Sequence, residues 1–367
     1  MNLDTYKVLA IETLKGLIEV QSYSKEEGQV ADLMEAVLNN SEYQTHRRGN
    51  NVWVFGKHNI DGKPLLLLNS HLDTVNASAS WTKNPFEPLV EYGKLYGLGS
   101  NDAGGCLCSL MATFLALDKK EQVYNLVFAA SAEEEISGKG GFELIQNEIG
   151  KIDLGIVGEP TLMQMAIAEK GLMVLDVEAK GKAGHAARGE GVNAIEKAMK
   201  DLKWFQTYKY EQDSDVLGPV KMTVTQIEAG CQHNVVPDSC KFVVDVRSNE
   251  HYSNKELFDL IDQQTESDVK ARSFRMNSSG ISLKHPLVQA GIKMGRSYYG
   301  SPTTSDQAIM KGFPTLKFGP GDSARSHTAN EYINISEIEE GIEIYYQLLD
   351  GLDIQPSLKL DADETLG

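Results

Sequence analysis

PLLLLNSHLDTV, residues 64–75, contains four consecutive leucines and then turns polar at His71 and Asp73. A continuous apolar run bounded by polar residues is typical of a strand buried on both faces, as in a parallel sheet covered by helices. The polar residues then lie at the carboxyl end of the strand, where open α/β sheets bind their ligands. His71 could bind a metal ion there while Asp73 accepts a hydrogen bond from the other ring nitrogen. For His71 taken alone, a histidine with a purely structural role is the simpler interpretation.

Two later apolar segments also end in acids. The segment YNLVFAASAEEEI ends in Glu133, Glu134 and Glu135, and IDLGIVGEPT ends at Glu159. Three adjacent carboxylates repel one another, so a buried strand end would carry them only with a cation or a catalytic task. A solvated acidic loop is the alternative. Asp102 precedes the apolar helix expected at 106–117, where capping that helix is its simplest role.

Length and composition set limits on the class of protein. With 367 residues the chain exceeds one core, and its 41% hydrophobic and 24% charged residues are those of a soluble globular protein. The net charge of −17 disfavours nucleic acid as a partner. No apolar stretch is long enough to span a membrane, and no signal peptide is recognisable at the start, so we expect no membrane partner and a cytoplasmic location.

The pattern of apolar and polar residues changes along the chain and predicts two domains. Residues 1–171 and 283–352 alternate buried strands with helices, whereas 172–282 contain strands with period-two alternation and two helices, which indicates an inserted α+β domain. Within the first domain, 81–105 is expected to be an irregular loop and 285–300 a helix. A capping box at Ser336 and Glu339 is expected to begin the last helix. The polar tail 353–367 is expected to be disordered.

Two imidazoles and three carboxylates are thus available to one region. This is the ligand set for a pair of zinc ions that share a bridging carboxylate. Its members are His71, Asp102, Glu135, Glu159 and His327.

At these residues the chain resembles the M20 family of dinuclear zinc amidohydrolases over nearly its whole length. The resemblance implies a zinc-peptidase-like catalytic domain, a mostly parallel sheet flanked by helices, with an inserted dimerisation domain. SHLDTV is similar to the first metal motif of the family, with His71 as a ligand and Asp73 as its orienting partner. GLGSNDAGG is similar to the G-x-x-D-x-K-G-G motif, with Asp102 as the bridge; Ala103 replaces the usual lysine, and one residue is missing before the glycine pair.

Three further motifs complete the resemblance in the catalytic domain. In SAEEEISGKGG it makes Glu134 the general base and Glu135 a ligand, with Glu133 where the family usually has aspartate. VGEPT gives Glu159 to the first metal ion, and SHTANEY gives His327 to the second. The resemblance therefore implies two Zn²⁺ ions per subunit, with Co²⁺ able to substitute.

The resemblance extends into the inserted domain. GKAGHAARGEGVNAI is similar to a segment whose histidine stabilises the oxyanion across a homodimer interface, here His185, although alanines replace the usual serines. In NVVPDSCKFVVDVR, Asn234 and Arg247 match positions that contact the substrate.

The substrate implied by the resemblance is a small N-acyl amino acid. The motifs are most similar to the acetylornithine deacetylase branch, which serves arginine biosynthesis. Succinyl-diaminopimelate desuccinylase, N-acetyl-lysine deacetylase and dipeptidase or carboxypeptidase activities remain alternatives. A two-domain ligand-binding protein would explain the layout but not the adjacent glutamates, and a glycosidase would leave both histidines without a role.

Overall fold

The chain divides into two compact units. The computed structural model describes residues 2–354. The first unit contains the residues up to Ile167, Gly280–Tyr299 and the residues from Ser305 on, and the second contains Ala168–Ser279 and Gly300–Thr304. The predicted domain boundaries, 171/172 and 282/283, lie a few residues from these divisions. The assignment of residues 300–304 to the second unit was not predicted. Apart from residues 353 and 354, the predicted disordered tail lies outside the described residues.

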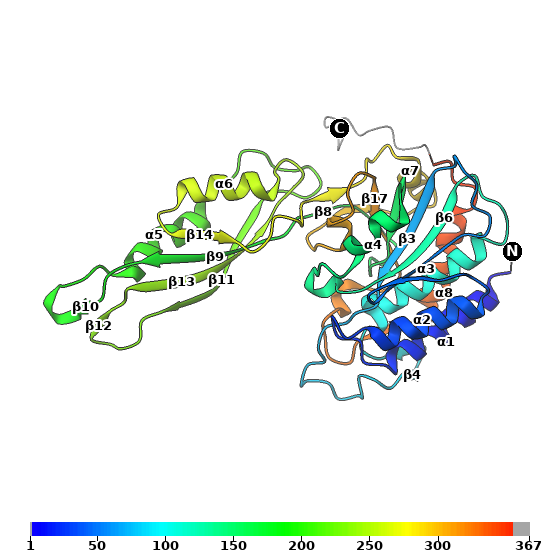
Figure 1. Cartoon of the computed structure of the whole chain (residues 1–367), viewed down its shortest axis with the longest axis horizontal. Coiled ribbons are helices and arrows are strands. Elements are labelled where there is room, and N and C mark those ends of the chain that lie inside the picture. The colour runs from blue at the N-terminus through cyan, green and yellow to red at the C-terminus, as the bar shows by residue number, and fades with distance from the viewer. Residues whose placement is uncertain (1, 355–367) are drawn as a thin grey trace. The chain divides into compact units, whose positions relative to one another are not determined.

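A nine-stranded sheet forms the centre of the first unit (Figure 1). Its strand order is β1-β2-β6-β3-β7-β17-β8-β15, with β16 paired to β8. The four central strands β6, β3, β7 and β17 run parallel, whereas β1, β2 and β8 join through antiparallel pairs. This confirms the mostly parallel sheet. The strands are β1 His46–Arg48, β2 Asn51–Phe55, β3 Leu65–His71, β6 Asn125–Ser131, β7 Leu154–Val157, β8 Met165–Glu169, β15 Ser279–Gly280, β16 Tyr298–Ser301 and β17 Thr315–Lys317.

Helices cover this sheet. They are α1 Asp4–Ile18, α2 Gly28–Asn40, α3 Gly105–Leu117, α4 Phe142–Ile149, α7 Pro286–Lys293 and α8 Ile335–Leu349. Every residue of α3 is buried, because α3 packs on β3 and β6 and is flanked by α1 and α8 (Figure 1). Burial on all sides explains why its sequence has no polar face. Among the described residues, no helix combines the length and apolar composition needed to cross a membrane.

Three sequence-based expectations about elements were wrong. The stretch 81–105 contains β4 Leu89–Glu91 and β5 Lys94–Tyr96, which form a small antiparallel sheet with β18 Tyr332–Asn334. The helix expected at 285–300 ends at Lys293, and the chain continues into β16. The last helix starts two residues earlier than expected, with its capping box at Asn334 and Glu337.

The second unit is a four-stranded antiparallel sheet with two helices, as expected for a small α+β domain. The strand order is β11-β13-β9-β14, and its apolar residues pack against α5 and α6. Strict alternation of buried residues with half-buried or exposed ones along β9 reflects a sheet with one covered face. The elements are β9 Met173–Lys180, α5 Ala194–Thr207, β11 Lys221–Ala229, β13 Ser239–Arg247, α6 Asn254–Gln264 and β14 Asp268–Ala271, with the short pair β10 Gly184–His185 and β12 Val235–Val236.

Candidate metal centre

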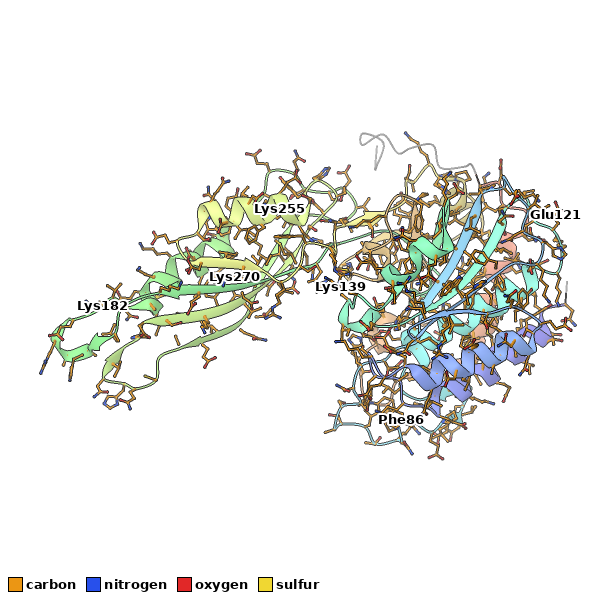
Figure 2. All side chains as sticks on the ribbon, in the orientation of Figure 1. Phe86, Glu121, Lys139, Lys182, Lys255 and Lys270 are labelled. Carbon is orange, nitrogen blue, oxygen red and sulfur yellow. The ribbon has the colours of Figure 1, made fainter. Side chains whose placement is uncertain are left out.

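Three neighbouring parallel strands of the first unit end in potential ligands. His71 is the last residue of β3 and lies in register with Ser131, the last residue of β6. Glu134 and Glu135 lie in the short helix η2 (Glu134–Ile136) that follows β6, and Glu159 follows β7 by two residues. All are at the carboxyl edge of the sheet; Figure 2 labels Lys139, in the loop that follows η2, and Glu121, which precedes β6 at the opposite edge.

Asp102 and His327 reach the same edge from loops. Asp102 lies in a tight turn, η1 (Ser100–Gly104), where its own backbone is not helical (φ −122°, ψ 97°), and this turn runs directly into α3. Gly99 begins this turn at φ 74°, a left-handed conformation that glycine adopts without steric cost. His327 follows the short helix η5 (Ser323–Arg325) and is itself left-handed, with φ 58°.

The carboxylate of Asp102 lies between the two imidazoles. Its Oδ1 is 3.4 Å from His71 Nε2, and its Oδ2 is 3.7 Å from His327 Nε2. On the first side, His71 Nε2 is also 3.9 Å from Glu159 Oε1. On the second side, His327 Nε2 is 3.0 Å from Glu135 Oε2. The five side chains therefore form two groups that share one carboxylate.

In this cluster the carboxylates outnumber the side chains that can carry a positive charge. Burial lowers the pKa of His71, but Asp102, Glu134 and Glu159 outweigh burial and raise it. The hydrogen bond to Glu135 raises the pKa of His327 to about 9. Burial raises the pKa of Glu134 well above its usual range and that of Glu159 to about 8. Both imidazoles thus favour the protonated form and two acids the neutral form, as expected of a cluster built around cations.

The donor set fits divalent metal ions. His71 is 2% exposed, and its Nε2 makes no hydrogen bond within the described residues. One ligand atom each from His71, Glu134 and Glu159 lie within 4.8 Å of one another, as do those of His71, Asp102 and Glu135. Imidazole nitrogen and carboxylate oxygen are ligands that Zn²⁺ takes in enzymes.

Asp73 was predicted to orient His71 through its carboxylate, but it does so through its backbone carbonyl. The hydrogen-bond partner of His71 Nδ1 is the backbone carbonyl of Asp73 at 2.8 Å, whereas the Asp73 carboxylate is 3.6 Å away. That carboxylate accepts the backbone N–H groups of Glu134 at 3.0 Å and Glu135 at 3.1 Å, and the hydroxyl of Ser24 at 2.6 Å. Asp73 therefore fixes the turn that carries both glutamates, while its backbone fixes the His71 ring.

Sequence reasoning missed Glu27, which holds the first residue of the glutamate turn. Glu27 is fully buried and accepts the N–H of Glu133 at 3.1 Å. Glu133 has a left-handed backbone, with φ 55°, and its carboxylate accepts the N–H of Gly140 at 3.1 Å. Of the three adjacent glutamates, Glu133 thus has a structural partner inside its own loop. Glu27 also accepts the N–H of Lys25 and the side-chain amide of Asn50, both at 2.7 Å, and no local pattern marks its contact with the distant Glu133.

Two more buried acids were missed. Asp306 accepts the hydroxyl of Ser131 at 2.6 Å and the amide of Asn69 at 3.1 Å, behind the ends of β6 and β3. Burial raises its pKa to about 6.

Glu331 accepts three backbone N–H groups of the Asp102 turn. Burial and the charge of Asp102 raise the pKa of Glu331 to about 8, although the three N–H donors act to lower it. The only sequence signal for Glu331 was its place in SHTANEY, four residues after His327.

The other predicted residues belong to the second unit. His185 is exposed in β10, which begins two residues after Lys182, the residue labelled in Figure 2, and its Nδ1 accepts the N–H of Ala187 at 3.2 Å. The carbonyl of Asn234 accepts the N–H of Ala186 at 3.0 Å, so His185 and Asn234 lie at the same end of this unit. Arg247 ends β13 at the other end of the sheet and binds the carboxylate of Asp245 through two hydrogen bonds of 2.8 and 3.0 Å.

Comparisons with known proteins agree with the geometry of the first unit. The model of peptidase family M20/M25/M40 matches residues 67–351. Acetylornithine deacetylase of Buchnera aphidicola subsp. Schizaphis graminum is 27% identical over 308 residues, 79% of this chain and 81% of that protein. Succinyl-diaminopimelate desuccinylase of Orientia tsutsugamushi (strain Boryong) is 25% identical over 378 residues, 94% of this chain and 96% of that protein.

Solved structures share the fold. Aminopeptidase PepT of Bacillus cereus superposes with a TM-score of 0.75 at 19% identity, covering 94% of this chain and 98% of that one. A dinuclear metal-binding M20 peptidase of Bacillus subtilis superposes with a TM-score of 0.67 at 13% identity, covering 94% and 98%. The family model spans most of the chain, including the strand ends and loops that carry the candidate ligands. The chain therefore belongs to peptidase family M20/M25/M40 and is a hydrolase that acts on amide bonds.

Proposed function

We propose that this protein is a dinuclear zinc deacylase of a small N-acyl amino acid, with N-acetyl-L-ornithine as the foremost candidate substrate. The observation that carries the proposal is the position of Asp102, whose two oxygens face two different imidazoles. Relatives at 25–28% identity include acetylornithine deacetylases and succinyl-diaminopimelate desuccinylases, which favour this substrate class. Service in arginine biosynthesis and a cytoplasmic location are parts of the same proposal.

The two groups of side chains define the two metal positions of the proposal. His71 and Glu159 would hold the first ion, and His327 and Glu135 the second. Asp102, whose two oxygens face His71 and His327, would belong to both positions. Because the imidazole Nδ1 of His71 is already bound to the Asp73 carbonyl, Nε2 is the nitrogen left for metal.

Glu134 is the general base of the proposed reaction. It is grouped with His71 and Glu159 but makes no hydrogen bond to His327, unlike Glu135. When bound, the metal pair lowers the pKa of the attacking water and polarises the amide carbonyl. Glu134 takes the proton from this water and delivers it to the leaving amine. Burial raises the pKa of its carboxyl, which suits a group that must both accept and return a proton.

Arg247, Asn234 and His185 form the proposed contacts to the substrate and the oxyanion. Arg247 would exchange Asp245 for the substrate carboxylate, to which a guanidinium can bind with two parallel hydrogen bonds. Asn234 and His185 lie beyond the opposite end of β13, whose nine residues span eight rises of about 3.3 Å, or roughly 26 Å. One small molecule cannot contact both ends of that strand. This supports a homodimer in which His185 and Asn234 come from one chain and Arg247 from the other.

A metal titration coupled to a substrate panel tests the proposal. The full chain, stripped with a chelator, should regain activity as Zn²⁺ or Co²⁺ approaches two equivalents per chain. N-acetylornithine should give the highest kcat/KM in a panel with succinyl-diaminopimelate, N-acetyl-lysine and dipeptides. A higher value for another member would replace the substrate but keep the chemistry. Full activity without bound metal, or ligand binding without hydrolysis, would refute the proposal, and the second outcome would support a binding protein.

A further inference from the structure

Glu331 makes an unusual set of contacts that the proposed reaction does not use. Its Oε1 accepts the backbone N–H groups of Asn101 at 2.8 Å and Asp102 at 2.9 Å. Its Oε2 accepts the N–H of Gly99 at 3.0 Å. Glu331 as a whole is 2% exposed, so these bonds are made away from water. One carboxylate thus satisfies three donors of the turn that presents Asp102.

The segment that carries Glu331 also carries the second imidazole. His327 precedes Glu331 by four residues, and β18, which begins at the next residue, pairs with β5. The backbone of Glu331 takes part as well, because its carbonyl accepts the N–H of Gly97 at 3.1 Å. The Glu331 carboxylate therefore fastens the turn bearing Asp102 to the segment bearing His327.

A second set of hydrogen bonds joins the turn that bears Asp102 to the segment that leads to His327. The side chain of Asn101 accepts the N–H of Asp322 at 3.0 Å and donates to its carbonyl, also at 3.0 Å. Asn101 can therefore hold the turn near the segment 322–327 without Glu331. The N–H groups of Gly99, Asn101 and Asp102 have Glu331 as their acceptor, so the orientation of the turn, and with it the direction of the Asp102 carboxylate, depends on Glu331.

We infer that Glu331 is a positioning residue that fixes Asp102 at its bridging place between His71 and His327. This inference rests on the proposed dinuclear site. Groups that orient metal ligands without binding metal typically change metal affinity by about 10- to 100-fold when they are replaced. Glu331 would act in this way through the backbone of the ligand and not through its side chain.

The test compares the zinc affinity of Glu331→Gln with that of the wild-type chain. Glutamine has the same shape, but its amide nitrogen carries hydrogens and cannot accept a hydrogen bond from a backbone N–H. We expect Glu331→Gln to bind zinc about 10- to 100-fold more weakly than wild type in competition with a chromophoric chelator. At saturating zinc, most of the wild-type kcat should return, because Glu331 touches neither substrate nor the reacting water.

Asp118→Asn is the matched control. Asp118 is a buried carboxylate of the same unit, 3% exposed, and it also accepts backbone N–H groups, those of Lys57 at 2.8 Å and His58 at 3.4 Å. It contacts none of the candidate ligands. Asp118→Asn should lower the melting temperature of the metal-free chain while its zinc affinity stays within about twofold of wild type.

Two results would overturn the inference. One is wild-type zinc affinity in Glu331→Gln, and the other is an equal loss of affinity in Asp118→Asn, which would mean that any loss of stability weakens the site. If Glu331→Gln does not fold, Glu331→Asp takes its place, since it keeps the charge but is one methylene too short to reach all three donors. Wild-type affinity in Glu331→Asp would then overturn the inference. Failure of the wild-type chain to bind zinc would instead refute the proposed function.

Discussion

Glu134 and Glu135 are neighbours in the chain, but their carboxylates have different surroundings. Glu135 lies 3.0 Å from His327 Nε2, on the second side of Asp102. Glu134 is grouped with His71 and Glu159 on the first side. Their backbone N–H groups share one acceptor, the carboxylate of Asp73, which fixes the relative direction of the two side chains. This difference gives the two glutamates separate tasks in the proposed reaction.

Replacing each glutamate by glutamine should separate these tasks. Glu134→Gln is expected to keep two zinc ions per chain and to lose roughly 100- to 10,000-fold in kcat, because a general base typically contributes that much. Glu135→Gln is expected to lose the second zinc ion. Metal content by elemental analysis, together with steady-state kinetics on the same samples, checks both. The assignment of the two residues would be reversed if Glu134→Gln lost metal and Glu135→Gln kept it.

At the scale of residues, the sequence revealed the acids and histidines at strand ends but not the groups that hold them. His71, Glu134, Glu135 and Glu159 follow apolar runs, and the topology of a parallel sheet brings such ends to one edge. Two of the partners of the Asp73 carboxylate are backbone N–H groups, which look alike in every sequence. Which acid accepts them depends on long-range folding, and for this reason Glu27 and Glu331 could not be predicted from patterns.

At the scale of elements, apolar periodicity located the cores of helices and strands better than their ends. The last helix shows why. Ser336 with Glu339 and Asn334 with Glu337 have the spacing of a capping box two residues apart. The chain remains extended through Asn334 because β18 pairs with β5 up to that residue, so the helix begins at Ile335. A distant strand thus selects between two caps that the local sequence permits equally.

The start of α7 gives a prediction about pH. His285 is its N-cap, and its Nδ1 accepts the N–H of Leu287 at 3.2 Å. Burial lowers the pKa of His285 from 6.5 to about 4, so the folded chain keeps the ring neutral while the unfolded chain protonates it. Between pH 4 and 6.5 the unfolded state binds more protons. Stability therefore rises as the pH rises through this window.

His285→Asn tests this effect, because asparagine can cap the helix but does not titrate. The free energy of unfolding of the wild type, relative to that of the variant, should increase by about 2 kcal/mol between pH 5 and pH 7. Denaturant unfolding at several pH values measures this difference, in which the contributions of all other groups cancel. Parallel pH profiles for the two proteins would show that His285 is solvated in the folded state.

At the scale of the whole molecule, the inserted unit could be predicted from the sequence, but the assignment of Gly300–Thr304 to that unit could not. Residues 172–282 differ in texture from their flanks, because a half-exposed antiparallel sheet alternates along the chain and a covered parallel sheet does not. The segment Gly300–Thr304 has only five residues and no pattern of its own. It joins the second unit through single contacts, such as the 3.0 Å hydrogen bond from Lys170 N–H to the Ser301 carbonyl.

One edge of the second unit bears on the proposed homodimer. β11 is an edge strand of its sheet, and an edge offers unpaired N–H and C=O groups to a partner strand. Beside it on α5, Met199 is 61% exposed and Ile195 is 39% exposed. In the proposed symmetric dimer the same patch would serve both chains, so one interface would place His185 of each chain in the same way.

Complementation between two inactive variants tests whether His185 acts in the partner subunit. His185→Ala and Glu134→Ala chains are mixed in equal amounts under conditions that exchange subunits. If His185 serves the opposite site, each mixed dimer has one site that lacks both groups and one that has both. Random exchange makes about half of the dimers mixed, so activity should rise to about a quarter of wild type.

The control for this experiment is a mixture of Glu134→Ala with Glu159→Ala. These two carboxylates belong to one group of the first unit, so every site in a mixed dimer lacks one of them and activity should stay at background. Exchange itself is verified by mass spectrometry of the native dimers with one chain isotope-labelled. If exchange is complete and the His185 mixture also stays at background, His185 acts within its own chain or has no part in the reaction. In that case, the length of β13 would exclude contact of His185 and Arg247 with the same substrate molecule, and one of the two would lose its proposed role.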